Sequence, residues 1–329
     1  MSDYPRLADL PLRIESLELV RRVLNVSSEF ERVTTTIQLS GDGETGEGED
    51  VTYQSELHDD YPRPDLAGEW TVDTYSQRLE PLGLEDYRRW AFESAGLDLA
   101  LRQAGLTLAE AVGREYRPIR FVVSTRQDIQ RFLAVRPELE FKVDPTSDWT
   151  REEIDELAAT GKIRCADLKA YYRGTVVDQE PDARLYRDVV DGFADAVIED
   201  AGFTDETRPI LQEAADRLSY DAPIHSVADV EALELAPRWL NIKPSRFGTV
   251  RGLLETIAYA EERGISLYGG GQFELGPGRF HIQALASTYY ADNANDVAPA
   301  VYNAPDLPPD PPASPLPVPE SPRGLAFSA

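Results

Sequence analysis

The chain is poor in residue types that often carry chemistry. Its 329 residues include one cysteine and only four lysines, so the other 29 basic side chains are arginines. A single cysteine, Cys165, excludes an intrachain disulfide and a metal cage built from several thiolates. The scarcity of lysine makes the position of each lysine informative.

Long apolar runs are also lacking. No run approaches the ~20 residues that a membrane span needs, and the N-terminus "MSDYPRLADL" lacks the basic and then apolar pattern of a signal peptide. We therefore expect a soluble, cytoplasmic protein with no membrane partner.

Positive charge is scarce relative to negative charge. The chain has 59 Asp plus Glu against 33 Lys plus Arg, a formal charge of -26. Binding to nucleic acid is disfavoured, because phosphates need a basic surface. Since 42% of the residues are hydrophobic, the chain is not expected to be disordered. We interpret the charge as adaptation to molar salt, as in a halophilic protein, where the Debye length falls to about 3 Å. A dedicated basic partner is the weaker alternative.

Short apolar runs alternate with amphipathic segments from residue 118 onward. Repeated strand–helix units of this kind build a parallel sheet, and eight of them close into a TIM barrel. An eighth strand is expected at "NDVAP", and a doubly wound open sheet remains the alternative. The predicted strands lie at 119–124, 139–144, 162–168, 195–200, 217–222, 238–243 and 265–270.

The chain is expected to have three parts. Residues 1–115 combine β-rich segments with a helical segment at 85–105, which predicts an α+β capping domain. Residues 116–302 form the modified barrel. Residues 303–329 hold nine of the 24 prolines, which predicts an extended tail. Its apolar end either docks on the body or stays free.

Charged residues recur at the predicted carboxyl ends of consecutive strands. These ends meet on one face of a parallel barrel, where active sites lie. A carboxylate after a strand often caps the next helix, so a single one proves little. The lysines are more informative, because three of the four follow strands and a buried lysine can exchange its proton where arginine cannot. The strand-end residues are Lys142 and Asp144, Asp167 and Lys169, Glu199, Asp221, and Lys243.

Three of these carboxylates come from adjacent strands. Asp167, Glu199 and Asp221 suit a hard divalent cation, because Mg²⁺ prefers oxygen ligands. Mn²⁺ is the expected substitute. Lysines beside such a metal predict abstraction of a proton next to a carboxylate.

Several motifs resemble the enolase superfamily, in its muconate-lactonising and o-succinylbenzoate-synthase-like subgroup. They are "GDGETGEGED", "AFESAGLDLALRQAG", "NIKPSRFGTV", "GGGQFELGPGR" and "NDVAP", and the resemblance extends to about residue 300. It implies that Asp167, Glu199 and Asp221 hold the metal and that Lys243 is the acid–base group. It further implies a small carboxylic acid substrate, self-association into a homo-oligomer, and elimination, cycloisomerisation or epimerisation.

The sequence also departs from the family pattern. The second strand of the family usually carries Lys-x-Lys, but here Lys142 is followed by Asp144 in place of the second lysine. Lys169 stands where the family usually has asparagine. The change puts two-base racemisation in doubt, and our hypothesis is that Lys169 supplies the missing charge.

Other residues complete the candidate site. Gln272 and Glu274 are expected to line the pocket, His225 is a possible general acid, and His58 belongs to the capping domain over the substrate. One alternative is a barrel that binds a metal or ligand without catalysis. Another is a sugar-acid dehydratase, which is disfavoured because "LYGGGQFE" lacks the histidine of the seventh strand.

Overall fold

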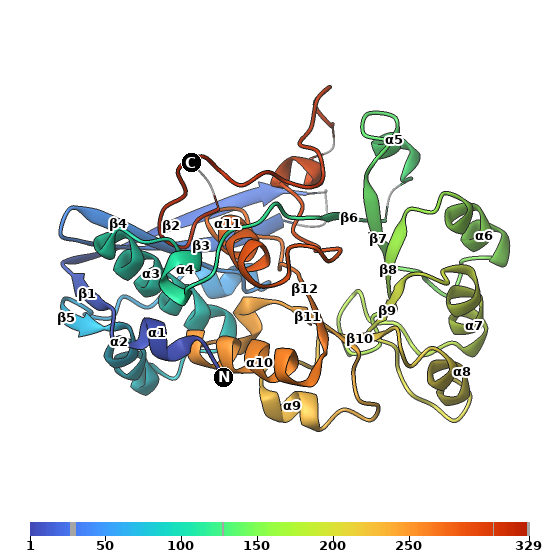
Figure 1. Cartoon of the computed structure of the whole chain (residues 1–329), viewed down its shortest axis with the longest axis horizontal. Coiled ribbons are helices and arrows are strands. Elements are labelled where there is room, and N and C mark those ends of the chain that lie inside the picture. Colours follow the sequence, from blue (N-terminus) through green and yellow to red (C-terminus); the bar gives the residue numbers. More distant parts are fainter. Residues whose placement is uncertain (27–30, 127, 305, 328–329) are drawn as a thin grey trace.

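The computed structural model describes residues 1–26, 31–126, 128–304 and 306–327. Its N-terminal part contains a three-stranded antiparallel sheet, a two-stranded sheet and helices (Figure 1). The strands are β1 (Pro11–Ile14), β2 (Ser16–Asn25), β3 (Glu31–Gly41), β4 (Glu44–Asp50) and β5 (Gly68–Thr71). The helices are α1 (Tyr4–Ala8), α2 (Val72–Leu79), α3 (Asp86–Ala104) and α4 (Leu108–Val112).

Helix α3 packs directly on β4, and glycines make this contact possible. A Cβ atom at Gly48 would lie 1.9 Å from the carbonyl oxygen of Ala91, and one at Gly46 would lie 2.2 Å from the amide nitrogen of Leu99. Any larger residue would force the helix away from the strand. The glycines of "GDGETGEGED" therefore have a packing role.

The second part is a curled, seven-stranded parallel sheet. Its strand order follows the chain from β6 to β12, which excludes the doubly wound alternative, whose order reverses. All seven predicted strands are present. They are β6 (Val122–Thr125), β7 (Glu140–Val143), β8 (Ile163–Asp167), β9 (Val197–Glu199), β10 (Leu218–Tyr220), β11 (Trp239–Ile242) and β12 (Ser266–Gly269).

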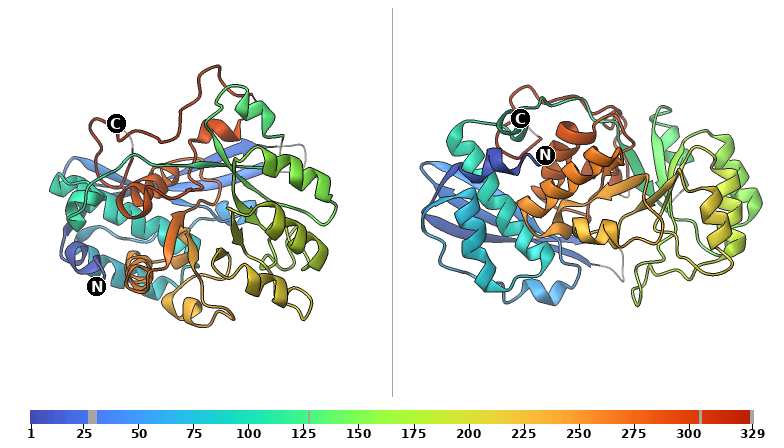
Figure 2. Two further views of the ribbon diagram at one scale, coloured as in Figure 1. Left: turned by 45° about the vertical axis from the view of Figure 1, so that its right-hand side comes forward. Right: turned by 60° about the horizontal axis from the view of Figure 1, so that its bottom comes forward.

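Helices cover the outer face of this sheet, with α6, α7 and α8 stacked beside β7 to β10 (Figures 1 and 2). Helix α6 begins with a capping box, in which Thr150 and Glu153 each bond the backbone N–H of the other. The helices are α5 (Gln130–Leu133), α6 (Arg151–Ala159), α7 (Ala183–Gly192), α8 (Arg208–Glu213), α9 (Val227–Glu231), α10 (Val250–Arg263) and α11 (Gly278–Leu285).

The predicted eighth strand is reduced to two isolated bridges. Asn295 pairs with Phe121 just before β6, and Asp296 pairs with Gly270 just after β12. The Asn295 side chain reinforces this closure: its Oδ1 accepts from the backbone N–H of Gly269, and its Nδ2 donates to the carbonyl of Arg120. One buried amide thus joins the two edges of the sheet.

Most of the described proline-rich tail lies along the body, and one loop of it stands out from the surface (Figures 1 and 2). Leu316 pairs with Ile119, and the backbone N–H of Leu325 donates to Asp98 on α3 at 2.7 Å. Leu325 and Phe327 are buried. Of the two alternatives for the apolar end, the docked one is therefore observed.

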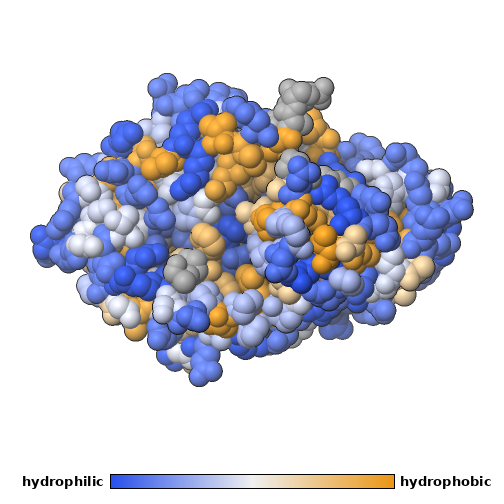
Figure 3. Space-filling view, turned by 90° about the horizontal axis from the view of Figure 1, so that it is seen from above, coloured by the Kyte–Doolittle hydropathy of each residue, from blue (hydrophilic) through white to orange (hydrophobic). Residues whose placement is uncertain are grey.

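The surface is largely hydrophilic, with separate apolar patches on the face seen from above (Figure 3). This pattern agrees with the strongly acidic composition. Among the described residues, no helix is both long enough and apolar enough to cross a membrane.

Candidate metal and acid–base site

Three carboxylates meet at the carboxyl ends of the central strands. Asp167 and Glu199 are the last residues of β8 and β9, and Asp221 directly follows β10. All three are fully buried, and each offers an oxygen within 4.8 Å of the others. Parallel pairing sets Asp167 opposite Glu199, which explains why the strand ends converge. We call Asp167, Glu199 and Asp221 the carboxylate triad.

The triad suits a hard divalent cation. Asp221 Oδ1 is buried without a hydrogen-bond partner among the described residues, and an unpaired buried oxygen is costly unless a ligand satisfies it. The surroundings of the triad are rich in both charges, with six carboxyl groups and four buried cationic side chains close together. The carboxylates belong to Asp144, Asp167, Glu199, Asp200, Asp221 and Asp296, and the cations to Lys142, Lys169, Lys243 and Arg246.

Lys243 contacts the triad from β11. It follows the strand with an extended backbone and places its Nζ 2.8 Å from Asp221 Oδ2. Burial lowers the pKa of Lys243, but Asp221 and Tyr172 together outweigh that effect, so the net pKa is raised. In this arrangement the ammonium form is held by Asp221.

Lys142 and Lys169 contact the triad at Asp167. The Nζ of Lys142 lies 3.0 Å from Asp167 Oδ2 and also contacts Glu199. Lys169 contacts the same Asp167 oxygen, and its Nζ is 3.6 Å from Asp144 Oδ1. Strand alternation is not what brings Lys169 inward, because β8 ends at Asp167. A left-handed turn with φ of 56° at Lys169 does so.

The pKa values of the buried carboxyl groups are shifted in opposite directions, because burial raises each pKa, whereas nearby lysines lower those of Asp167 and Glu199. Burial raises the pKa of Glu199 to about 8, against the opposing charge of Lys142. It also raises the pKa of Asp200 to about 7, although two backbone N–H groups bond that carboxylate. For Asp167, the charges of Lys142 and Lys169 overcome burial and hold the pKa well below its usual range.

Sequence analysis missed several polar side chains that bond the triad. Asn241 Nδ2 donates to Glu199 Oε2 at 3.1 Å, and Tyr268 Oη donates to the same oxygen. Asn241 lies two residues before Lys243, so strand alternation could have revealed it. Cys165 also points inward, with its Sγ 3.6 Å from Glu199 Oε2.

A second group of missed residues surrounds Asp221. Tyr172 Oη donates to Asp221 Oδ2 at 2.9 Å, and Arg246 Nη2 lies 3.4 Å from the same oxygen. Both come from loops after strands, where no periodic pattern predicts side-chain direction. Together with Lys243 they concentrate three donors on one carboxylate oxygen.

The other predicted site residues are placed differently. Gln272 lies near the triad, because its amide oxygen, in the orientation that satisfies both amide atoms, accepts from Arg246 Nε at 3.0 Å. Glu274 instead bonds the backbone of Gln272 and pairs with Arg279. His58 is buried in the capping domain against Thr35.

His225 and Asp144 also have partners outside the triad. His225 is exposed, and its Nδ1 lies 2.9 Å from Asp86 Oδ2 at the start of α3. Asp144 pairs with Arg126 at 2.9 Å as well as with Lys169. Of the two, only Asp144 contacts a lysine that bonds the triad, namely Lys169.

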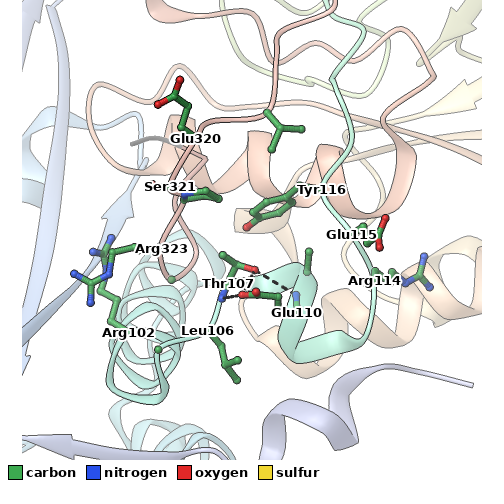
Figure 4. Close-up of a pocket in the computed structure, with 15 residues that line it drawn as sticks. Arg102, Leu106, Thr107, Glu110, Arg114, Glu115, Tyr116, Glu320, Ser321 and Arg323 are labelled. Carbon is green, nitrogen blue, oxygen red and sulfur yellow. Dashed lines mark hydrogen bonds between the residues drawn. The ribbon is translucent and has the colours of Figure 1, made fainter.

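Two cavities of the described structure are lined by no member of the triad. One, of about 560 Å³, is lined by residues 102–116 and 318–324, between α4 and the tail. Tyr116 lies centrally in its lining, with Arg102 and Arg323 on one side and Arg114 on the other (Figure 4). The second, of about 330 Å³, reaches Cys165 and Tyr268 from the amino ends of the strands.

Solved structures with the same architecture are enolase-superfamily proteins. Muconate cycloisomerase from Pseudomonas fluorescens has a TM-score of 0.71 at 21% identity, covering 96% of each chain. Dipeptide epimerase from Methylococcus capsulatus, complexed with a Mg ion, has a TM-score of 0.69 at 19% identity, covering 90% of this chain and 92% of that one. The expected fold, a capping domain over a modified barrel, is confirmed.

The sequence itself places the chain in a family. The chain belongs to the family described as domain of unknown function DUF8230, whose N-terminal domain matches residues 5–111 and whose C-terminal domain matches residues 115–304. A comparison with curated proteins gives no match.

Proposed function

We propose that the protein is a Mg²⁺-dependent lyase or isomerase that abstracts a proton α to a carboxylate. The product would arise by elimination, cycloisomerisation or epimerisation. The observation that carries this proposal is the buried triad with a lysine at each of two different members, Lys243 at Asp221 and Lys169 at Asp167.

The triad would hold the metal, and the lysines would handle protons. When bound, the cation would neutralise charge that develops on the substrate carboxylate. Lys243 and Lys169 keep their protons here because Asp221 and Asp167 bear full charge. A cation bound to Asp221 and Asp167 would offset their charges. Burial would then lower the pKa of Lys243 and Lys169 toward the range of a general base.

Lys142 has a different proposed role. It is fully enclosed, and its Nζ contacts both Asp167 and Glu199. Such a cation stabilises the closely spaced carboxylates and the negative charge of a substrate without meeting the reacting carbon. Asp144 would position Lys169 through their 3.6 Å contact.

The test is exchange of substrate α-protons with deuterium from solvent. Muconolactone and dipeptides are the first acids to try, because the structural neighbours bind or act on such molecules. Exchange should require Mg²⁺ or Mn²⁺ and should be lost in Lys243→Ala. Lys162→Ala is the matched control, since the other three lysines contact the carboxylate triad and Lys162 does not in the described structure.

Metal binding gives a readout that needs no substrate. Mn²⁺ binding, followed by electron paramagnetic resonance, should be abolished in Asp167→Asn and retained in Lys162→Ala. Tight Mn²⁺ binding with no exchange across a broad panel of carboxylic acids would instead favour the non-catalytic barrel.

A further inference from the structure

The loop after β12 is held to the capping domain by two buried side chains of opposite charge. Arg32 on β3 is fully buried, and Glu49 on β4 is 1% exposed. Among the described residues, the hydrogen-bond partners of both include no charged side chain. Such side chains are seldom fully buried without a partner of opposite charge. Here backbone groups of residues 272–278 take that place.

Arg32 binds carbonyl oxygens on both sides of the domain boundary. Its Nη1 and Nη2 donate to the carbonyls of Thr52 and Val51 in the capping domain, at 2.8 and 2.7 Å. Its Nε and Nη2 donate to the carbonyls of Phe273 and Gln272 after β12, at 3.1 and 2.8 Å. A guanidinium group presents five N–H donors in a fixed fork, which suits a contact to several carbonyls at once. A lysine at this position could not make all of these bonds.

Glu49 binds backbone amides of the same loop. Its Oε1 accepts from the N–H groups of Leu275 and Gly276 at 2.7 and 2.9 Å, and its Oε2 accepts from those of Gly276 and Gly278 at 3.0 and 2.9 Å. A Cβ atom at Gly278 would lie 2.9 Å from Glu49 Oε2, so glycine permits this approach. The cation therefore binds the carbonyls at 272–273, and the anion binds the amides at 275–278.

The side chain of Gln272 connects this loop to the carboxylate triad. In the orientation that satisfies both amide atoms, its oxygen accepts from Tyr87 Oη at 3.0 Å and from Arg246 Nε at 3.0 Å. Arg246 Nη2 in turn lies 3.4 Å from Asp221 Oδ2. Contacts therefore run without a break from Arg32 through Gln272 and Arg246 to a member of the triad.

We propose that Arg32 and Glu49 are positioning residues: they fix the loop after β12 on the capping domain, so that the Gln272 amide holds the Arg246 guanidinium against Asp221. Attachment of the capping domain is thereby coupled to the geometry of the triad. The relevance of this coupling to catalysis rests on the proposed function, which makes Asp221 a metal ligand. The coupling itself can be measured without activity.

Hydrogen exchange at the Arg246 Nε–H group tests the coupling, because Gln272 is its acceptor. The signal is identified in ¹⁵N NMR spectra by its loss in Arg246→Lys. Arg32→Lys and Glu49→Gln should each speed this exchange about tenfold, the effect of roughly one lost hydrogen bond. Gln272→Ala should speed it at least as much. Adding Arg32→Lys to Gln272→Ala should give no further change, because Arg32 acts through Gln272.

Backbone amides of the β3–β4 ladder separate positioning from a general loss of stability. They should exchange at the native rate in these variants, while the amides of Leu275, Gly276 and Gly278 exchange faster in Glu49→Gln. Unchanged exchange at Arg246 in Arg32→Lys and Glu49→Gln, or equal acceleration throughout the capping domain, would overturn the proposal.

The native chain provides a test that needs no folded variant. The amides bonded to Glu49 should open with the same free energy as the β3–β4 ladder, since the loop and the capping domain would form one cooperative unit. Opening at a lower free energy, as in an unattached loop, would overturn the proposal. Failure of the native chain to bind Mn²⁺ would refute the proposed function instead, and the exchange rates would still decide this inference.

Discussion

The two lysines beside the triad reach it by different structural routes. Lys243 continues a regular strand in extended conformation and bonds Asp221. Lys169 lies beyond the end of its strand, in the left-handed region, and bonds Asp167. The Lys243 side matches the family motif, whereas the Lys169 side departs from it.

The difference shows how a site can be altered without moving its carboxylates. A second lysine at position 144, one residue past the end of β7, would have continued the strand that already carries Lys142. In its place stands Asp144, and a cation is supplied from the neighbouring turn at some conformational cost. If Lys169 in the turn takes the place of a strand lysine, removal of either Lys169 or Lys243 should lower the rate of exchange, and the two losses should differ only in size.

Loss of Lys243 is the largest expected effect. Lys243→Ala should lower the rate of exchange or turnover by about 10²- to 10⁴-fold, the contribution of a positioned acid–base group. Metal affinity should change little, because Lys243 is not a ligand. Full activity of this variant on a true substrate would refute the assigned role.

Lys169 should matter less than Lys243. Lys169→Asn keeps a residue that tolerates positive φ, so it removes the amine without straining the turn. We expect a fall of about 10²-fold in exchange, the lower end for general acid–base catalysis, measured by NMR in deuterated solvent. No fall at all, with Mn²⁺ binding intact, would show that Lys169 is only an ion-pair partner.

The pH dependence of stability tests the protonation of Glu199, the triad member on β9. Burial raises the pKa of Glu199 from 4.5 to about 8, so the metal-free native protein binds a proton that the unfolded chain releases between these values. This contribution is fully present below about pH 4.5 and is lost as the pH rises through about 8.

Thermal unfolding in EDTA should therefore show a melting temperature that falls from pH 5 to 8. The free energy of unfolding should fall by less than about 1.4 kcal/mol per pH unit for this one proton. Glu199→Gln should reduce the slope. Asp200 acts in the same direction, since its pKa is raised from 3.8 to about 7, so some slope should persist. An unchanged slope in the variant would contradict the assignment to Glu199.

Asp144 should give the smallest effect. Asp144→Asn removes one carboxylate from Lys169 but leaves Asp167 in contact with it. Stability should change by less than about 1 kcal/mol, and the acid limb of the exchange profile should move to lower pH, because less negative charge holds the lysine proton. Arg126→Gln, which removes the other partner of Asp144, should leave that limb in place.

Much of this arrangement could be predicted from the sequence. The seven strands and the triad follow from apolar runs and from the rule that parallel strands end on one face. Tyr172, Arg246 and the turn at Lys169 could not be predicted, because loop residues follow no periodic pattern. The barrel closure is shorter than expected: "NDVAP" forms two isolated bridges rather than a strand, and the Asn295 side chain reinforces them.

That closure has a dynamic consequence. Every other neighbouring strand pair in the sheet is joined by a ladder, whereas in the described part of the chain β6 and β12 are linked through Asn295 and Asp296 alone. Opening of the native barrel should therefore begin along this line, where fewest backbone bonds must break. The amides of Val122, Gly269 and Asp296, whose hydrogen bonds cross this line, should exchange earliest among the barrel strands. Asp296 Oδ2 also lies 3.8 Å from Lys142 Nζ, so opening of this line would displace a charge that lies next to a lysine of the site.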